Sequence, residues 1–291
     1  NDGTLMTAAH AARYPVLTFA SGPTNSIRGA AILSGLDDAL VVDIGGTTTD
    51  IGLLLGGFPR EAAMTVEVGG VRTNFRMPDL LAVGLGGGSL VRDSGDSIGP
   101  DSVGFELERR ALVMGGDSLT MSDIAVASGL MEFGDRAKVE HIDFADIALE
   151  TAGEIVEVAL DQVRPNAASL PVILVGGGAP LLSGDSIGGG EIMRPEYGQV
   201  ANAIGASIAM VSGECDRIFS LDEMTREDAV ASAKARAASQ AQEAGAEPES
   251  IRIVEMDEVP LSYRPGNTTR LRVKAVGDLA GASVKIDAGA G

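Results

Sequence analysis

Residues 39–55 read Ala-Leu-Val-Val-Asp-Ile-Gly-Gly-Thr-Thr-Thr-Asp-Ile-Gly-Leu-Leu-Leu, and this stretch carries the strongest structural signal in the chain. Two apolar runs of strand length flank a polar centre of glycines, threonines and aspartates. Short apolar runs bounded by turn residues are typical of buried strands. The stretch therefore predicts two buried strands joined by a tight polar turn.

The turn between these strands, Gly45-Gly46-Thr47-Thr48-Thr49, has the composition of a phosphate-binding loop. Glycine lets backbone N–H groups approach an anion closely, and threonine hydroxyls add donors without adding positive charge. Asp43, at the end of the first strand, is placed to face a hydrated Mg²⁺ ion carried by the phosphates. The alternative is an ordinary hairpin with solvent-exposed threonines. The density of glycines and hydroxyls favours phosphate binding.

A second strand followed by glycines occupies residues 171–178, which read Pro-Val-Ile-Leu-Val-Gly-Gly-Gly. A continuous apolar run of this length is typical of a strand buried in a parallel sheet. Gly176, Gly177 and Gly178 follow at its carboxyl end, where open α/β sheets bind ligands. The structural alternative is a tight turn into the segment that begins at Ala179.

These motifs, together with others in the same order, resemble those of a known family. Residues 43–50, Asp-Ile-Gly-Gly-Thr-Thr-Thr-Asp, are similar to the phosphate hairpin of the actin, sugar-kinase and Hsp70 ATPases, and more narrowly to that of the hydantoinase/oxoprolinase A-subunit family. The other matching motifs are Ser21-Gly22-Pro23, Gly86-Gly87-Gly88-Ser89, Thr120-Met121-Ser122-Asp123, Val175-Gly176-Gly177-Gly178-Ala179 and Ala201-Asn202-Ala203-Ile204-Gly205-Ala206. Together they cover most of residues 15–212, and several ordered motifs are more specific than any one alone.

The resemblance implies an α/β fold of the actin-like, ribonuclease-H-like type, with a mixed sheet, flanking helices, and ATP and Mg²⁺ as ligands. It assigns the metal to Asp43 and the adenosine to the three glycines Gly176, Gly177 and Gly178. It assigns the phosphates to the turn residues Gly45, Gly46, Thr47, Thr48 and Thr49. Asp50 either acts at the metal beside Asp43, as a second catalytic carboxylate, or braces the turn.

The resemblance also implies an activity, the ATP-dependent opening of a cyclic amide such as a hydantoin or 5-oxoproline. The amide oxygen is phosphorylated, and hydrolysis follows on this chain or on a B-type partner subunit. Phosphoryl transfer needs mainly positioning and charge neutralisation. Two alternatives stay open: a nucleotide-binding switch or assembly module without small-substrate catalysis, and a small-molecule kinase. The family's Pro-Gly-Pro-Ala-Cys-Tyr-Gly segment is replaced by Gly-Pro-Asp-Ser-Val-Gly-Phe at residues 99–105, which leaves the substrate open.

Composition limits the partners of this chain. Its 291 residues carry a formal net charge of -19, which argues against nucleic acid or an anionic membrane as a partner. The single cysteine, Cys215, excludes an intrachain disulfide, and no apolar run approaches the length of a membrane span, about 20 residues. We expect a soluble, cytoplasmic protein; whether it forms a homo-oligomer stays open. The chain starts without methionine and has one Asp-x-Gly-Gly-Thr loop where the family has an earlier one too, which suggests a fragment.

Two regions are expected along the chain. Residues 1–219 form the actin-like region, with helices over about residues 25–33 and 144–163, a third strand over residues 62–68, and a helix capped by Ser122. Residues 220–291 form a small α+β appendage, with a charged helix over residues 225–244 and strands over residues 251–259 and 269–275. We expect the tail, residues 281–291, to be frayed.

Other catalytic motifs lack their required context. The Gly-x-Ser-x-Gly matches around Ser97 and Ser186 have no strand before and helix after them, which argues against an esterase. His10 and His141 stand apart from other ligand-type residues, which argues against a zinc site. The chain has neither a Walker loop nor a dinucleotide-binding fingerprint.

Overall fold

The computed structural model of the chain describes residues 3–62, 67, 68, 70–72, 77–165, 169–208, 210–261 and 267–280. The chain divides into two compact units, Asn1–Gly3 with Ala20–Ala206 and Thr4–Phe19 with Ser207–Gly291, here called the first and the second unit. The boundary proposed from the sequence, between residues 219 and 220, lies inside strand β12 (Met210–Ser220) of the second unit.

A mixed sheet forms the centre of the first unit, as the sequence predicts. Its strand order is β10-β11-β9-β1-β2-β3, and β6 also pairs with β2. β1 (Ala39–Ile44) and β2 (Thr49–Leu55) form the predicted antiparallel hairpin. β1 runs parallel to β9 (Val172–Val175), and β9 runs parallel to β11 (Gly190–Met193). This order, an antiparallel group followed by parallel strands, is that of the ribonuclease-H-like half of the actin-like fold.

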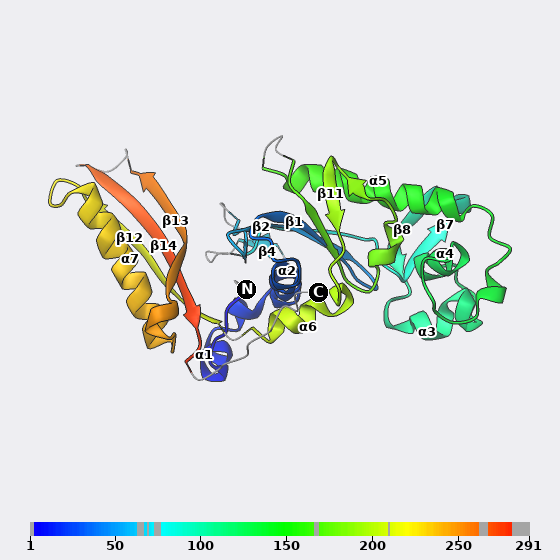
Figure 1. Cartoon of the computed structure of the whole chain (residues 1–291), viewed down its shortest axis with the longest axis horizontal. Coiled ribbons are helices and arrows are strands. Elements are labelled where there is room, and N and C mark those ends of the chain that lie inside the picture. Colours follow the sequence, from blue (N-terminus) through cyan, green and yellow to red (C-terminus); the bar gives the residue numbers. More distant parts are fainter. Residues whose placement is uncertain are drawn as a thin grey trace. The chain divides into compact units, whose positions relative to one another are not determined.

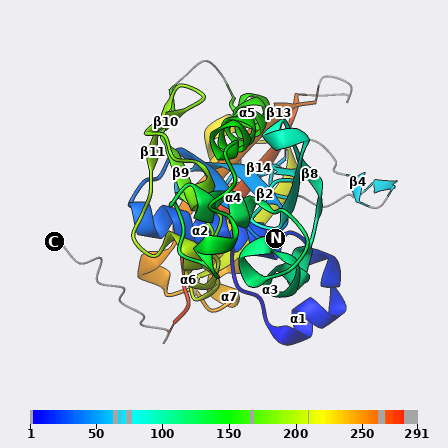
Figure 2. The same ribbon diagram turned by 90° about the vertical axis from the view of Figure 1, so that its right-hand side faces the viewer.

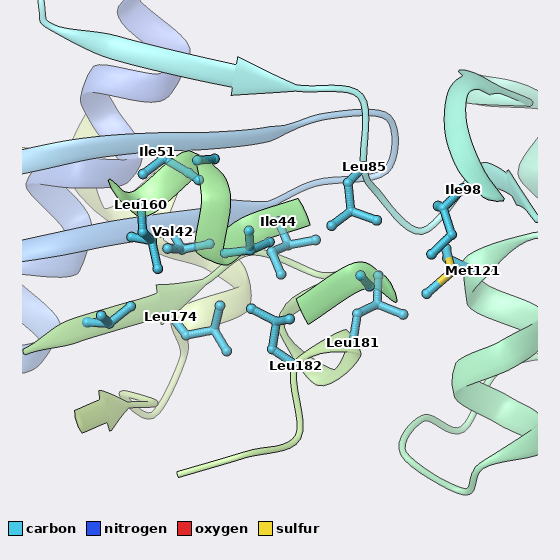
Figure 3. Close-up of a cluster of buried hydrophobic side chains, with 14 of the residues drawn as sticks. Val42, Ile44, Ile51, Leu85, Ile98, Met121, Leu160, Leu174, Leu181 and Leu182 are labelled. Atoms are coloured by element: carbon cyan, nitrogen blue, oxygen red, sulfur yellow. The ribbon is translucent and has the colours of Figure 1, made fainter. Parts of the chain in front are cut away.

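Helices cover both faces of this sheet, and the alternation of side chains in β1 determines which residue meets which helix. Leu40 and Val42 pack with α5 (Ala145–Val163), and Figure 3 shows Val42, Leu160 and Leu174 in this cluster. Ala39 and Val41 pack on the other side with α2 (Ser21–Ser34) and α6 (Ala201–Ala206). Figures 1 and 2 show α5 on one side of the strands and α2 with α6 on the other. The predicted mixed sheet with flanking helices is thus confirmed.

The strands beside β2 differ from the expected third strand. The sequence predicts that strand over residues 62–68, but residues 63–66 lie outside the described part of the chain, and β4 (Glu67–Val68) pairs with β5 (Val71–Arg72). β2 pairs instead with β3 (Phe58–Pro59) and β6 (Leu80–Val83). The chain turns back at once because Gly56 and Gly57 both adopt positive φ, the conformation that a two-residue hairpin turn requires.

A smaller part of the first unit follows β6. It contains β7 (Ser89–Arg92), β8 (Ser97–Ser102), α3 (Leu107–Arg110) and α4 (Met121–Ala127). The predicted cap of this last helix, Ser122, is wrong: Thr120 is the N-cap. Thr120 and Asp123 form a capping box, with the Asp123 carboxylate accepting from the Thr120 N–H at 2.7 Å. α2 likewise starts earlier than expected, so that Ser21-Gly22-Pro23 lies in its first turn.

The second unit is a three-stranded antiparallel sheet with one helix packed along it (Figure 1). The strand order is β12-β14-β13, with β13 at Arg252–Pro260 and β14 at Thr268–Asp278. α7 (Arg226–Glu243) begins after the N-cap Thr225, and a short helix, α1 (Ala8–Arg13), also belongs to this unit. The α+β character of this region is confirmed, whereas β12 was not predicted. The expected frayed tail, residues 281–291, lies outside the described residues.

No helix in the described part of the chain is both long and apolar enough to cross a membrane.

Candidate functional site

The predicted site residues meet at one edge of the sheet because β1 and β9 are parallel neighbours. Asp43 lies opposite Val175 in this pair, so the turn after β1 and the glycines after β9 emerge side by side. Gly178 N–H donates to the Ile44 carbonyl at 2.8 Å. A Cβ at Gly176, whose φ is +90°, would overlap the Asp43 carboxylate. The two glycine motifs therefore form one continuous backbone surface, which the sequence could only suggest.

A second glycine loop, residues 84–88, packs against the backbone of the turn. Gly87 and Gly88 donate their N–H groups to the carbonyls of Gly45 and Gly46, at 3.0 and 2.6 Å. A Cβ at Gly86 would overlap the backbone of Thr47, so only glycine permits this approach. The 84–88 loop thus packs against the turn and fixes its backbone.

The exposed side of the turn, here called its front, carries hydrogen-bond donors that have no acceptor among the described residues. Gly46, Thr47 and Thr48 are exposed, and no described residue accepts a hydrogen bond from their N–H groups or from the two hydroxyls. Successive free N–H groups form a concave surface suited to an anion. Thr49 differs, because it is buried and its hydroxyl donates to the Leu85 carbonyl at 2.7 Å. The structure thus places Thr49 where it braces the turn.

Asp43 and Asp50 lie directly opposite each other across β1 and β2 and on the same face of the sheet. Desolvation raises the pKa of Asp43, and a hydrogen bond from the Ser26 side chain offsets part of this rise. Desolvation also raises the pKa of Asp50, with the charge of Asp43 as the second cause. Two half-buried carboxylates in this position favour a bound proton or a cation.

This pair fits a magnesium ion that is carried largely by phosphates. The described residues contain no cluster of three or more His, Cys, Asp or Glu side chains that could hold a metal. Mg²⁺ prefers oxygen ligands and usually keeps several waters while binding one or two carboxylates and substrate phosphates. Asp43 and Asp50 supply that number of carboxylates beside the free donors of the turn.

The sequence reasoning did not find one part of this site. The contacts of the Asn202 side chain are not local in the sequence. Its Nδ2 atom donates to the Gly22 carbonyl at 2.8 Å and to the Ser26 hydroxyl at 3.2 Å, 180 and 176 residues away. The only sequence signal was that Ser21-Gly22-Pro23 and the motif around Asn202 both belonged to the ordered set.

A cavity of about 500 Å³ opens beside Gly176 and Gly177. Its lining is mainly apolar and includes Leu130, Leu174, Pro180, Leu182 and Pro195. Such a hollow suits a flat ring with apolar faces. Gly178 is buried behind it against Ile44, so the three predicted glycines divide into two that line the cavity and one that supports it.

Comparisons with known proteins show a similar family over part of the chain and a similar fold. A family model described as hydantoinase/oxoprolinase matches residues 1–133, whereas no curated protein matches. The nucleotide-free structure of an acetone carboxylase, from work on ATP-dependent acetone carboxylation, has a TM-score of 0.61 and 16% identity, covering 95% of this chain and 51% of that one. The ATP-dependent caprolactamase from Pseudomonas jessenii has a TM-score of 0.60 and 14% identity, covering 88% and 49%.

The chain therefore spans about half the length of these two enzymes, whose similarity shows a shared fold. The family match covers the hairpin, the 84–88 loop and the start of α2. Over residues 1–133, then, this chain is similar to the hydantoinase/oxoprolinase family.

Proposed function

We propose that this chain forms part of an ATP-dependent enzyme that activates the carbonyl oxygen of a cyclic amide. The observation that carries the proposal is the front of the turn, where the N–H groups of Gly46, Thr47 and Thr48 and two hydroxyls have no acceptor among the described residues. Because these donors are exposed and have no acceptor among the described residues, they are available to an anionic ligand. The phosphate oxygens of a nucleotide can accept hydrogen bonds from these N–H and hydroxyl groups.

Each part of the site has a role in this proposal. The free donors of Gly46, Thr47 and Thr48 hold the phosphates, and the apolar cavity beside Gly176 and Gly177 takes the adenosine. Asp43, with Asp50 behind it, holds the hydrated Mg²⁺, which neutralises phosphate charge when bound. Gly45 and Gly178 keep the backbone close, and Thr49 braces it.

The proposed reaction begins at the amide carbonyl oxygen, which takes the γ-phosphoryl group of ATP while ADP leaves. Phosphorylation leaves a C=N bond to the ring nitrogen and makes the ring carbon electrophilic. Water adds to this carbon, on this chain or on a B-type partner subunit, and the C–N bond then breaks as the ring nitrogen takes a proton and leaves. The acyl phosphate that remains is hydrolysed to a carboxylate and free phosphate. Positioning and charge neutralisation carry most of such a step. The two enzymes that share the fold are described as ATP-dependent and act on acetone and a lactam, which supports a carbonyl oxygen as the acceptor.

The first test is Mg-ATP binding by calorimetry to the full-length protein. We expect binding in the unmutated protein and at least a tenfold loss in Asp43→Asn, because one carboxylate ligand of the ion is removed. Asp146→Asn, an exposed position in α5, is the matched control and should bind as the unmutated protein does. Absence of binding in the unmutated protein would overturn the proposal.

A second experiment separates the amide-activating enzyme from its alternatives. ATP hydrolysis is measured alone and with hydantoin, 5-oxoproline or acetone added. We expect strong stimulation by a cyclic amide, with ring-opened product and free phosphate. Unchanged hydrolysis would instead indicate a nucleotide switch, and a stable phosphorylated product would indicate a kinase.

A further inference from the structure

We propose that Gln199 is the residue that selects the base of the nucleotide, by pairing its side-chain amide with the hydrogen-bonding edge of adenine. The inference rests on the proposed function, because it concerns the cavity assigned there to the adenosine. All the residues that line this cavity belong to the first unit. They divide into an apolar set and a few polar side chains, and the chemistry of the polar ones determines which ring binds.

Apolar groups form most of the cavity wall. Leu174 and Leu182 belong to it, and Figure 3 shows both in the buried cluster of the first unit. Such a wall accepts the faces of a flat ring, but it discriminates only weakly between rings of similar size. Discrimination by side chains therefore requires the polar residues that line the cavity, which are Ser183, Arg194 and Gln199.

Arg194 is part of the structure of the cavity wall. Its Nη2 atom donates to the carbonyls of Leu182 and Gly184, at 2.7 Å each. These bonds tie residues 182–184 to the residue that follows β11. An arginine side chain has donors only, so it cannot accept a hydrogen bond from an amino group. Adenine carries such a group at N6, and Arg194 therefore cannot recognise it.

Gln199 has the acceptor that Arg194 lacks. A glutamine amide places a carbonyl oxygen that accepts beside an NH₂ group that donates. Adenine presents the complementary pair, the N6 amino group next to a ring nitrogen, and glutamine binds this pair through two hydrogen bonds. A backbone carbonyl can only accept, and the single oxygen of Ser183 cannot span both atoms. Among the described residues the Gln199 amide has no hydrogen-bond partner, so it is available to a ligand.

The backbone fixes Gln199 beside the glycines that line the cavity. Gln199 lies in a single 3₁₀ turn, Gly198–Val200, and the Gly198 carbonyl accepts from the Gly176 N–H at 3.0 Å. Gly176 follows β9 and is itself one of the lining residues. Gln199 is exposed, so its amide is accessible to an incoming nucleotide. The turn after β9 and the turn before α6 thus bring the apolar wall and the amide to one place.

The experiment compares ATP with purine riboside triphosphate, which lacks the N6 amino group, and with inorganic tripolyphosphate, which lacks the nucleoside. Binding of the magnesium complex of each to the full-length protein is measured by calorimetry. We expect the unmutated protein to bind ATP about 5- to 150-fold more tightly than purine riboside triphosphate, the range of a good pair of hydrogen bonds to a base. Gln199→Leu keeps most of the side-chain bulk but removes the amide, so it should remove this preference.

Three comparisons make the test specific. Tripolyphosphate binding should be the same in Gln199→Leu and the unmutated protein, because the variant leaves the phosphate turn intact. Gln162→Leu, at an exposed position of α5, is the matched control and should keep the preference for ATP. Ser183→Ala removes the other polar side chain that can accept, and it should also keep the preference.

A preference that persists in Gln199→Leu, or one that is lost in Ser183→Ala, would overturn the inference. An unmutated protein that binds ATP and purine riboside triphosphate equally would overturn it too. Failure of the unmutated protein to bind either ATP or tripolyphosphate would instead overturn the proposed function itself, so the two failures are distinct.

Discussion

Asp43 and Asp50 occupy positions that stability alone would fill with uncharged side chains. They face each other across two strands and are half-buried, and the pKa of each is raised mainly by desolvation. Like charges directly opposite each other destabilise a strand pair. A hydrogen bond from the Ser26 side chain offsets only part of the rise in the pKa of Asp43. A site that keeps this pair without a bound cation therefore loses stability at neutral pH.

Replacing Asp50 by Asn should accordingly stabilise the metal-free protein at pH 7, by up to about 1 kcal/mol. The pKa of Asp50 is raised above its ordinary value of 3.8, so the folded state takes up a proton more readily than the unfolded state. The penalty is present at neutral pH and is relieved as the pH falls through the raised value towards 3.8. Urea unfolding at several pH values should show the gain shrinking in acid. An Asp50→Asn protein that is less stable than the original at pH 7 would contradict this account.

At the scale of elements, the contact between α2 and α6 depends on the absence of two side chains. Gly29 and Gly205 each face the backbone of the other helix, with no room for a methyl group. Glycine is unfavourable in a helix by about 0.5–1 kcal/mol relative to alanine, so these positions lose helix propensity in exchange for close packing. The gain is the position of Asn202 beside α2.

Gly29→Ala should therefore destabilise the first unit by about 1–3 kcal/mol, because α2 and α6 must separate. The matched control is Gly153→Ala in α5, where an added Cβ meets no atom within 4 Å. That change should stabilise by about 0.5–1 kcal/mol through helix propensity alone. Chemical denaturation of the two variants should give shifts of opposite sign. Equal shifts would mean that propensity, and not the helix contact, decides the outcome.

At the scale of the whole molecule, the proposed nucleotide site and the only cysteine belong to different compact units. Cys215 lies in the second unit, where it is 4% exposed. Burial raises the pKa of its thiol, which keeps the group protonated and slow to react. The rate of thiol modification therefore reports the opening of the second unit, and Mg-ATP binding reports the first.

Gly213→Ala should separate these two signals. A Cβ at Gly213 in β12 would overlap the backbone of α7 near Ala237 and Ala241, so the helix must move off the sheet. A loss of about 1.4 kcal/mol in the second unit corresponds to about tenfold faster modification of Cys215. Mg-ATP affinity should stay unchanged. Lys234→Ala, on the exposed side of α7, should alter neither rate nor affinity, and a parallel loss of ATP binding in Gly213→Ala would show that the units are coupled.

Local patterns in the sequence were enough to predict the hairpin, the strand before the three glycines and the helix that starts after Thr225. The order of the motifs was enough to predict the family whose model matches residues 1–133. These elements depend on residues that are close in the chain, so they can be predicted from turn residues and from the periodicity of apolar residues. The set of turn residues was also placed together, except that the hydroxyl of Thr49 is occupied inside the protein.

The tertiary structure alone decided the third strand, the presence of β12 and the contacts of Asn202 with Gly22 and Ser26. Each depends on a partner distant in the sequence: the paired residues of β12 and β14 are separated by 48 (Ser220 and Thr268) to 68 (Met210 and Asp278) positions, and Asn202 lies 176 residues from Ser26. The sequence alone does not distinguish a glycine in a turn from one in a loop or at a helix crossing, because the atoms that occupy the space of its missing side chain come from distant parts of the chain. Only the tertiary structure shows that Gly29 and Gly205 allow the backbones of α2 and α6 to come into contact. The sequence by itself determined the two strands of the hairpin and the turn between them, because these form from residues that are close in the chain.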